Sequence, residues 1–236
     1  MAEGHNEKHP HIRARQFIDR VVLGGSDGVI ESIATTSALN GAGVDFRTIL
    51  IAGFAFALAG GLSMFFSNYL SGKSELESLR IDIERERMEI ETEPEEERME
   101  LERLLAEEGY EKAEIDVIMN RLTKNKEMWL KTQLQHELHL HAEELSSNPA
   151  RKALPAGVAF FLLAMLSLLP YVASIGRVTA LLASAALSLL ALFALGSRLF
   201  TLRSLKLRAG LESAAIGAGA VSLLYLAGLL VARLWG

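Results

Sequence analysis

Four long runs of uncharged residues constrain this chain more than any other feature of its sequence. They cover residues 48–72, 153–176, 178–197 and 213–232. Each run is long enough to cross the hydrocarbon core of a bilayer as an α-helix, which takes about 20 residues. The runs therefore predict an all-α integral membrane protein.

A fifth segment, 21–44, has a similar length but contains Asp27 and Glu31. Its hydropathy alone makes it a weaker candidate for a span. Orientation supports it, because Lys and Arg concentrate on the cytoplasmic side of membrane proteins. The basic residues of the N-terminal tail and of the connection after run 178–197 fall on one side only if 21–44 also crosses. We therefore expect five spans, with the N-terminus in the cytoplasm and the C-terminus outside.

The segment between the second and third spans is strongly acidic. Residues 75–116 hold 18 Asp or Glu and 6 Lys or Arg, within a text rich in helix formers. We expect the second span to continue into it without a break, a new helix after Thr92 and Pro94, and an end at Gly109. Further helices are predicted at about 111–123 and 126–146. The predicted division is a cytoplasmic tail at 1–20, spans one and two in 21–72, a cytoplasmic helical domain at 73–151, and spans three to five in 152–236.

This acidic domain has two interpretations. It could be a solvated coiled segment that serves as a dimerisation stalk, or it could bind metal. Glu86 and Glu89 are three apart and share a helix face, as do Glu97 and Glu100. The break near Pro94 would fold the two pairs toward each other, and divalent cations favour converging carboxylate oxygens.

The stretch around 131–144 is rich in His and Glu. Gln133, Glu137 and His141 lie at steps of four, and His136 lies beside them. Imidazole and carboxylate ligands suit iron, zinc and nickel, so these residues are candidate metal ligands. For the histidines, an exposed polar helix face is the simpler interpretation, whereas Glu137 is favoured as a ligand.

Asp27 and Glu31 are four residues apart and share one face of the first predicted span. A charged side chain at the bilayer centre costs roughly 2.5–3.5 kcal/mol on insertion scales, so such residues usually face a cavity or pathway. Met64 and Asn68 lie on one face of the second span and offer a thioether and an amide. The alternative is that Asp27 is a helix cap at the interface. A path lined by these four residues would carry divalent cations, and its carboxylates would also bind protons.

Several function classes are disfavoured. The chain has no cysteine, which excludes disulfides and thiolate metal sites. Its acidic domain would repel phosphate, so we expect no nucleic-acid binding. The sequence shows no pairing of a nucleophile with a base that would indicate an enzyme. A membrane-anchored metal sensor or scaffold without transport stays open beside a transporter.

Three motifs resemble those of the vacuolar iron transporter family. The stretch "GGSDGVIES" resembles the first-span motif, with Asp27 at its aspartate, and "AGGLSMFFSNYLSGKSE" resembles the second-span motif, with Met64 at its methionine. The stretch "AGLESAAIGAGAV" resembles the opening of the fifth span, with Glu212 at its glutamate. The helices between the second and third spans resemble the cytoplasmic metal-binding domain of the family.

The resemblance implies a homodimer with five spans per subunit and a path between the subunits. It implies export of ferrous iron, and often manganese, from the cytoplasm in exchange for protons, without a prosthetic group; zinc is a further candidate ion. Asp27 and Met64 would be ligands of the path. Glu86, Glu89, Glu97, Glu100 and Glu137 would be ligands of the metal-binding domain. The cell (inner) membrane is the expected location.

The chain departs from the family pattern at two places. A glutamate is common in the second span where this chain has Phe56, and methionines are common where it has Gln133 and Leu134. Our hypothesis is that Glu31, one turn beyond Asp27, replaces the acid missing at Phe56.

Overall fold

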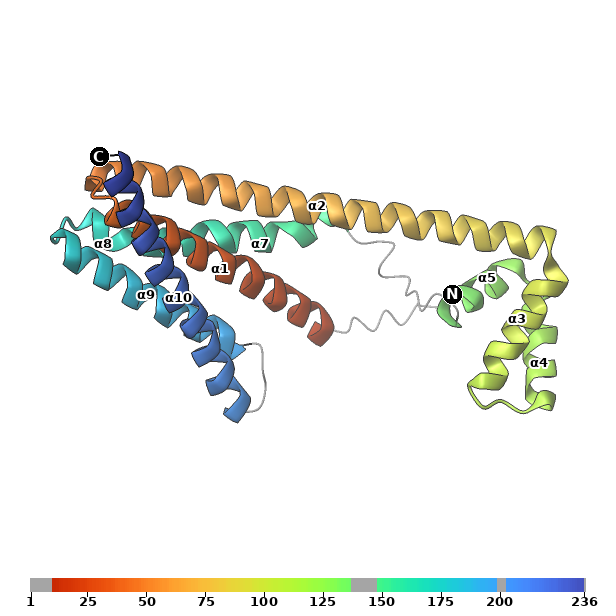
Figure 1. The fold of residues 1–236 in the computed structure, drawn as a ribbon. Coiled ribbons are helices and arrows are strands. Elements are labelled where there is room, and N and C mark those ends of the chain that lie inside the picture. Colours follow the sequence, from red (N-terminus) through yellow and green to blue (C-terminus); the bar gives the residue numbers. More distant parts are fainter. Residues whose placement is uncertain (1–9, 137–147, 199–202, 236) are drawn as a thin grey trace. The chain divides into compact units, whose positions relative to one another are not determined.

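The structure is a computed structural model that describes residues 10–136, 148–198 and 203–235. Every regular element in these ranges is a helix, which confirms the all-α class (Figure 1). The elements are α1 (Pro10–Gly41), α2 (Phe46–Thr92), α3 (Pro94–Glu107), α4 (Lys112–Leu122), α5 (Lys126–His136), α7 (Pro149–Ala164), the 3-10 helix η1 (Met165–Leu168), α8 (Leu169–Val172), α9 (Arg177–Arg198) and α10 (Arg203–Trp235).

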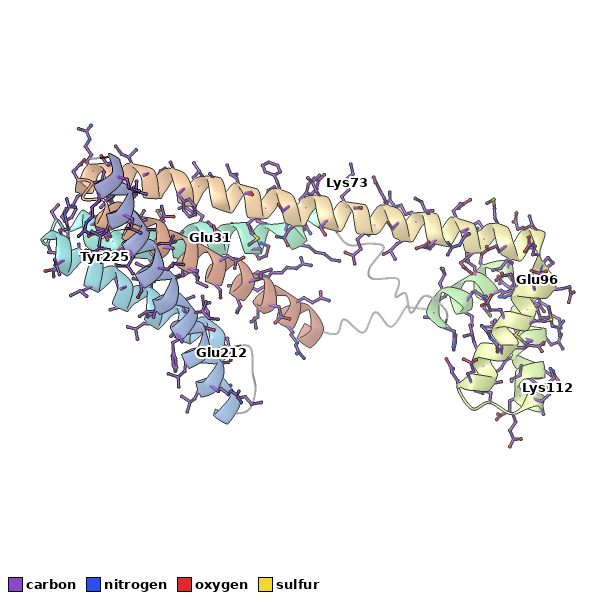
Figure 2. All side chains as sticks on the ribbon, viewed as in Figure 1. Glu31, Lys73, Glu96, Lys112, Glu212 and Tyr225 are labelled. Atoms are coloured by element: carbon purple, nitrogen blue, oxygen red, sulfur yellow. The ribbon has the colours of Figure 1, made fainter. Side chains whose placement is uncertain are left out.

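The chain divides into two compact units. One, which we call the membrane unit, comprises residues 1–69 and 149–236; the other, the acidic unit, comprises residues 70–148. Helix α2 runs through the boundary without interruption for 47 residues, as the sequence predicts. At 1.5 Å per residue it is about 70 Å long, roughly twice the thickness of a hydrocarbon core. The helix is therefore longer than a single span requires, and its densely charged part begins at Lys73 (Figure 2).

Four of the described helical segments are long and apolar enough to cross a membrane. They are Phe46–Thr92, Pro149–Val172, Arg177–Arg198 and Leu205–Leu234, and they contain the four uncharged runs of the sequence except for the end of run 153–176. Helix α1 has 32 residues but does not meet the same criterion of hydropathy and charge.

Helix α1 is nevertheless enclosed by the membrane unit. It packs against α7, η1, α9 and α10. A Cβ on Gly24 would collide with the backbone of Ala156 in α7, and a Cβ on Gly28 would collide with that of Phe160. Near its other end, Ala38 meets Gly228 of α10 in the same way. These small residues let the helix backbones approach closely, which is the usual basis of helix association in membranes.

The expected third span, 153–176, is not one continuous α-helix. Helix α7 gives way to η1 and then to α8, which ends at Val172. Pro170 lies in the first turn of α8, where its missing N–H and its ring disfavour a continuous α-helical ladder. The chain then turns through Ser174, with φ 52°, and Gly176, with φ 63°, before α9 begins.

The acidic unit has its own apolar core, built from α2, α3, α4 and α5. Pro94 is the first residue of α3, and Gly109 follows this helix with φ 99°, so the predicted break and end are both found. The predicted helix at 126–146 is described as far as His136. The core members are Ile90, Leu101, Leu105, Ile115, Met119, Leu122, Trp129 and Leu130.

Two glycines of α10 test the close packing of the membrane unit. A Cβ on Gly228 would collide with the backbone of Ala38, whereas a Cβ on Gly219 would meet nothing within 4 Å. We expect Gly228→Ala to lower the free energy of unfolding by about 1–3 kcal/mol, because neither backbone can move away cheaply. Gly219→Ala is the matched control and is expected to leave it equal or slightly higher. Thermal unfolding in detergent measures both; equal loss in the two variants would contradict the prediction.

Candidate metal path and metal-binding residues

The two carboxylates of α1 lie where this helix is less covered than at Gly24 and Gly28, which contact α7. Glu31, labelled in Figure 2, is exposed and Asp27 is half-buried. Val29, between them, and Ile33, beyond Glu31, are fully buried. Among the described residues, no side chain forms a hydrogen bond or an ion pair with either carboxylate. Their oxygens are therefore available to a cation or a proton.

The second-span residues Gly60 and Met64 contact α7, and Asn68 contacts Met64. A Cβ on Gly60 would collide with the ring of Phe160, and Met64 packs against the cluster of Ala57, Phe160 and Ala164. Asn68 donates through Nδ2 to the Met64 carbonyl at 2.8 Å and lies 3.2 Å from its sulfur. Gly28 of α1 and Gly60 of α2 thus bring both helices against α7, with Phe160 as their shared neighbour.

Phe56 belongs to the same apolar contact. Its ring lies 6.3 Å from that of Phe160, and its side chain packs against the cluster of Ala57 and Ala164. No hydrogen bond or ion pair in the described ranges joins Asp27 or Glu31 to Met64 or Asn68 of the same chain. Hydrogen bonds and ion pairs among the described residues therefore do not join the carboxylates of α1 to the thioether of α2.

The acidic unit buries two of the four glutamates that the sequence singles out. Glu86 of α2 is 2 % exposed and Glu97 of α3 is 7 % exposed. Gln133 of α5, fully buried, donates through Nε2 to Glu97 Oε2 at 2.9 Å. Each of these three side chains lies three or four residues from a member of the apolar core, so three helices place polar groups at the edge of that core.

The other two glutamates are partly exposed and lie beside arginines. Glu89 is 4.0 Å from Arg85, and Glu100 is 3.5 Å from Arg103. In the described part of the chain, no three His, Asp or Glu side chains are close enough to hold a metal ion together. The predicted set of ligands is incomplete there, because Glu137 and His141 lie outside the described residues.

Glu102, near these glutamates on α3, shows how a surface carboxylate of this unit is already occupied. Lys112 donates to it at 3.0 Å and Arg98 at 3.1 Å. The hydrogen bond from Lys112, followed by that from Arg98, holds the pKa of Glu102 below its ordinary value. A carboxylate bound by two cations of the protein is a poor ligand for a metal ion.

His136, a candidate ligand, is bonded to a glutamate that the sequence analysis did not single out. Its Nδ1 lies 2.6 Å from Oε1 of Glu108, the residue that follows α3. This contact joins the end of α5 to the end of α3. Glu108 has no local signal in the sequence, because it contacts a residue 28 positions away.

Glu212 lies on α10, where its side chain is exposed (Figure 2). The next residue, Ser213, packs against Gly196 of α9. Glu212 is therefore on a part of α10 that is not covered by the described helices of the same chain.

Comparisons with known proteins place this geometry in one family. The model of the VIT family matches residues 18–229, nearly the whole chain. "Vacuolar iron transporter 1" of Arabidopsis thaliana is 32% identical over 219 residues, which is 92% of this chain and 86% of the relative. "Vacuolar iron transporter 1" of Eucalyptus grandis is 30% identical over 212 residues, 89% of this chain and 85% of the relative. The protein of the same name from Tulipa gesneriana is 32% identical over 196 residues, 83% of this chain and 78% of the relative.

The bond between Gln133 and Glu97 gives a direct test of the buried polar contact. Gln133→Leu removes a donor from a buried carboxylate, and the lost hydrogen bond to a charged group is worth about 1.5–3 kcal/mol. We expect faster amide hydrogen exchange in α3 and α5 of the full chain. Gln135→Leu, an exposed position on the same helix, is the control and is expected to change little. Unchanged exchange in Gln133→Leu would show that this bond does not stabilise the unit.

Proposed function

This chain belongs to the VIT family, a family of transporters rather than enzymes, and we propose that it exports ferrous iron from the cytoplasm in exchange for protons. Manganese is proposed as a second cargo. The observation that carries the proposal is the outward face of α1, where Asp27 and Glu31 present carboxylates on a helix otherwise enclosed by apolar neighbours. Isolated charges are retained in membrane helices chiefly where they line a pathway.

The proposed path lies between two subunits of a homodimer. Within one chain Glu31 is exposed and Asp27 is half-buried, so a second copy is needed to enclose them. In this proposal α1 is a fifth span despite its low hydropathy, the N-terminus and the acidic unit are cytoplasmic, and the C-terminus is outside. Met64 contributes its thioether to the path, and Asn68 holds that side chain through its hydrogen bond.

In the proposed cycle the acidic unit collects cations. Glu86 and Glu97, which are buried, would hold a cation with Glu89, Glu100 and Glu137, and His136 and His141 would be additional donors. Carboxylate oxygens suit ferrous iron and manganese. Exchange with protons follows from the same chemistry, because a carboxylate of the path binds either a proton or the metal ion. We propose the cell (inner) membrane as the location, although the relatives named above carry a vacuolar name.

A metal sensor or scaffold is the second candidate. The burial of Glu86 and Glu97 in the acidic unit supports metal binding there whether or not the membrane unit conducts. The two candidates differ in what Asp27 does, because a scaffold needs no carboxylate on α1.

Flux measurements on reconstituted protein separate these candidates. Liposomes that contain the wild type are expected to take up ferrous iron, and manganese, only when a pH gradient is imposed. Asp27→Asn removes the charge that binds the cation and is expected to abolish the uptake. Asp19→Asn, an exposed aspartate on the same helix, is the control and should transport as the wild type does. No uptake by the wild type, together with metal binding, would favour the sensor or scaffold.

Glu31→Gln tests whether this residue replaces the acid that is missing at Phe56. The loss of one proton-binding and metal-binding group in the path is expected to lower the flux and to alter its dependence on pH. Glu75→Gln, at an exposed glutamate of the charged part of α2, is the control. Wild-type flux and pH dependence in Glu31→Gln would show that Asp27 acts without it.

A further inference from the structure

Helix α1 is tied to the start of α9 by a reciprocal set of hydrogen bonds. Arg177, the first residue of α9, donates through Nη2 to the Gly43 carbonyl at 2.8 Å and through Nη1 to the Asn40 carbonyl at 3.3 Å. In return, Asn40 lies with its Nδ2 3.4 Å from the Arg177 carbonyl and 3.3 Å from the Tyr171 hydroxyl. Each partner thus binds the backbone of the other, 137 residues away in the sequence.

We call the bonds between Asn40 and Arg177 the clamp, and its buried position strengthens these bonds. Asn40 is 4 % exposed and Tyr171 is fully buried, so water does not compete freely for their bonds. The two carbonyls that Arg177 binds belong to the end of α1 and the turn after it, where a helix leaves its last carbonyls without partners and favours a positive charge. Gly43 has φ 81°, a conformation that favours glycine and turns its carbonyl out of the helix.

A second set of hydrogen bonds holds α1 about two turns earlier in the helix, at Ser32. The hydroxyl groups of Ser32 and Ser167 are hydrogen-bonded to each other, 2.5 Å apart, and Ser32 also donates to the Ala164 carbonyl. Ser184 of α9 donates to the Ser167 carbonyl at 2.6 Å. The polar face of α1 is therefore bonded to η1, and η1 is bonded to α9.

The clamp determines which way the carboxylates point. Glu31 precedes Asn40 by nine residues, which is two and a half turns of an α-helix, so the two side chains point about 180° apart. Asp27 precedes Asn40 by thirteen residues and lies within about 40° of the Glu31 direction. When Asn40 is held against Arg177, both carboxylates must face away from α9.

We propose that Arg177 and Asn40 are positioning residues for transport, which fix the rotation of α1 and so aim Asp27 and Glu31 into the path. The inference rests on the proposed function for its effect on flux, and on the contacts above for its effect on α1. Neither residue touches the transported ion. Rupture of the clamp would leave the carboxylates present but poorly aimed.

The first measurement is ferrous iron flux per folded protein under reducing conditions. Arg177→Gln is expected to raise the KM about tenfold, since a hydrogen bond to a charged group is worth roughly that factor. Arg177→Lys keeps the charge but loses the two-armed donor, and is expected to be intermediate. Asn40→Ala breaks the clamp from the other side and is expected to match Arg177→Gln. Added to Arg177→Gln, it should cause little further change.

Arg47 supplies the matched control. It lies in the first turn of α2, its side chain is exposed, and among the described residues that side chain has no hydrogen bond or ion pair. Arg47→Gln removes the same charge close to the same turn and is expected to leave the KM unchanged. Equal KM values in Arg47→Gln and Arg177→Gln would overturn the proposal.

The second measurement does not depend on transport. The chain has no cysteine, so Ser37→Cys gives a single thiol on the inner face of α1, at a position that is fully buried. Reaction with a small membrane-permeant thiol reagent is expected to be slow in this background and several-fold faster when Arg177→Gln or Asn40→Ala is added. Arg47→Gln should not accelerate it.

The two measurements separate the possible failures. Unchanged thiol reactivity in both clamp variants would overturn the inference, whatever the flux. Faster thiol reactivity with an unchanged KM would also overturn it, because the clamp would then serve only stability. A wild type that carries no iron would overturn the proposed function, and the thiol reactivity alone would then support or overturn the control of α1 rotation.

Discussion

The rest of the membrane unit depends on how the polar groups of α1 are satisfied away from water. A polar group buried away from water must find its partner inside the protein, because an unsatisfied group costs free energy. Helix α1 meets this constraint with buried bonds from Ser32, Thr36 and Asn40 to carbonyl and hydroxyl groups of its own helix and of its neighbours. These bonds require α7, η1, α8 and α9 to surround one face of α1, and the glycines of α1 let them approach.

The same arrangement gives α1 two faces with different roles. One face is closed by hydrogen bonds to η1, α8 and α9, and another side carries Asp27 and Glu31 without partners in the described part of its own chain. A helix that served only as an anchor would gain nothing from the second face, since charges in a membrane are costly unless they pair or meet water. The asymmetry of α1 therefore supports a path for cations more strongly than the presence of the carboxylates does.

Local signals predict the elements of this fold well and their long-range contacts poorly. The unbroken α2, the start of α3 at Pro94 and the turn at Gly109 all follow from residues next to the feature. The sequence did not predict the η1 segment, because residues 153–176 form one uncharged run of uniform hydropathy. Pro170 could be recognised as a break only after the ends of α7 and α8 were known. Phe160, which meets both Gly28 and Gly60, and Arg177, which meets Asn40, have no local signal, because their partners lie over 90 residues away in the sequence.

The donor set of the acidic unit bears on which cation it would prefer. The resemblance to the family implies thioethers where this chain has Gln133, whose amide is bonded to the buried carboxylate of Glu97. Oxygen donors suit harder ions such as manganese, whereas thioethers shift a site toward softer ones. The exchange of Met for Gln thus moves the proposed collecting site toward oxygen ligands, while Met64 keeps a thioether at the proposed path. Capture in the acidic unit would then select cations through oxygen ligands, whereas transport would also use the softer thioether ligand of Met64.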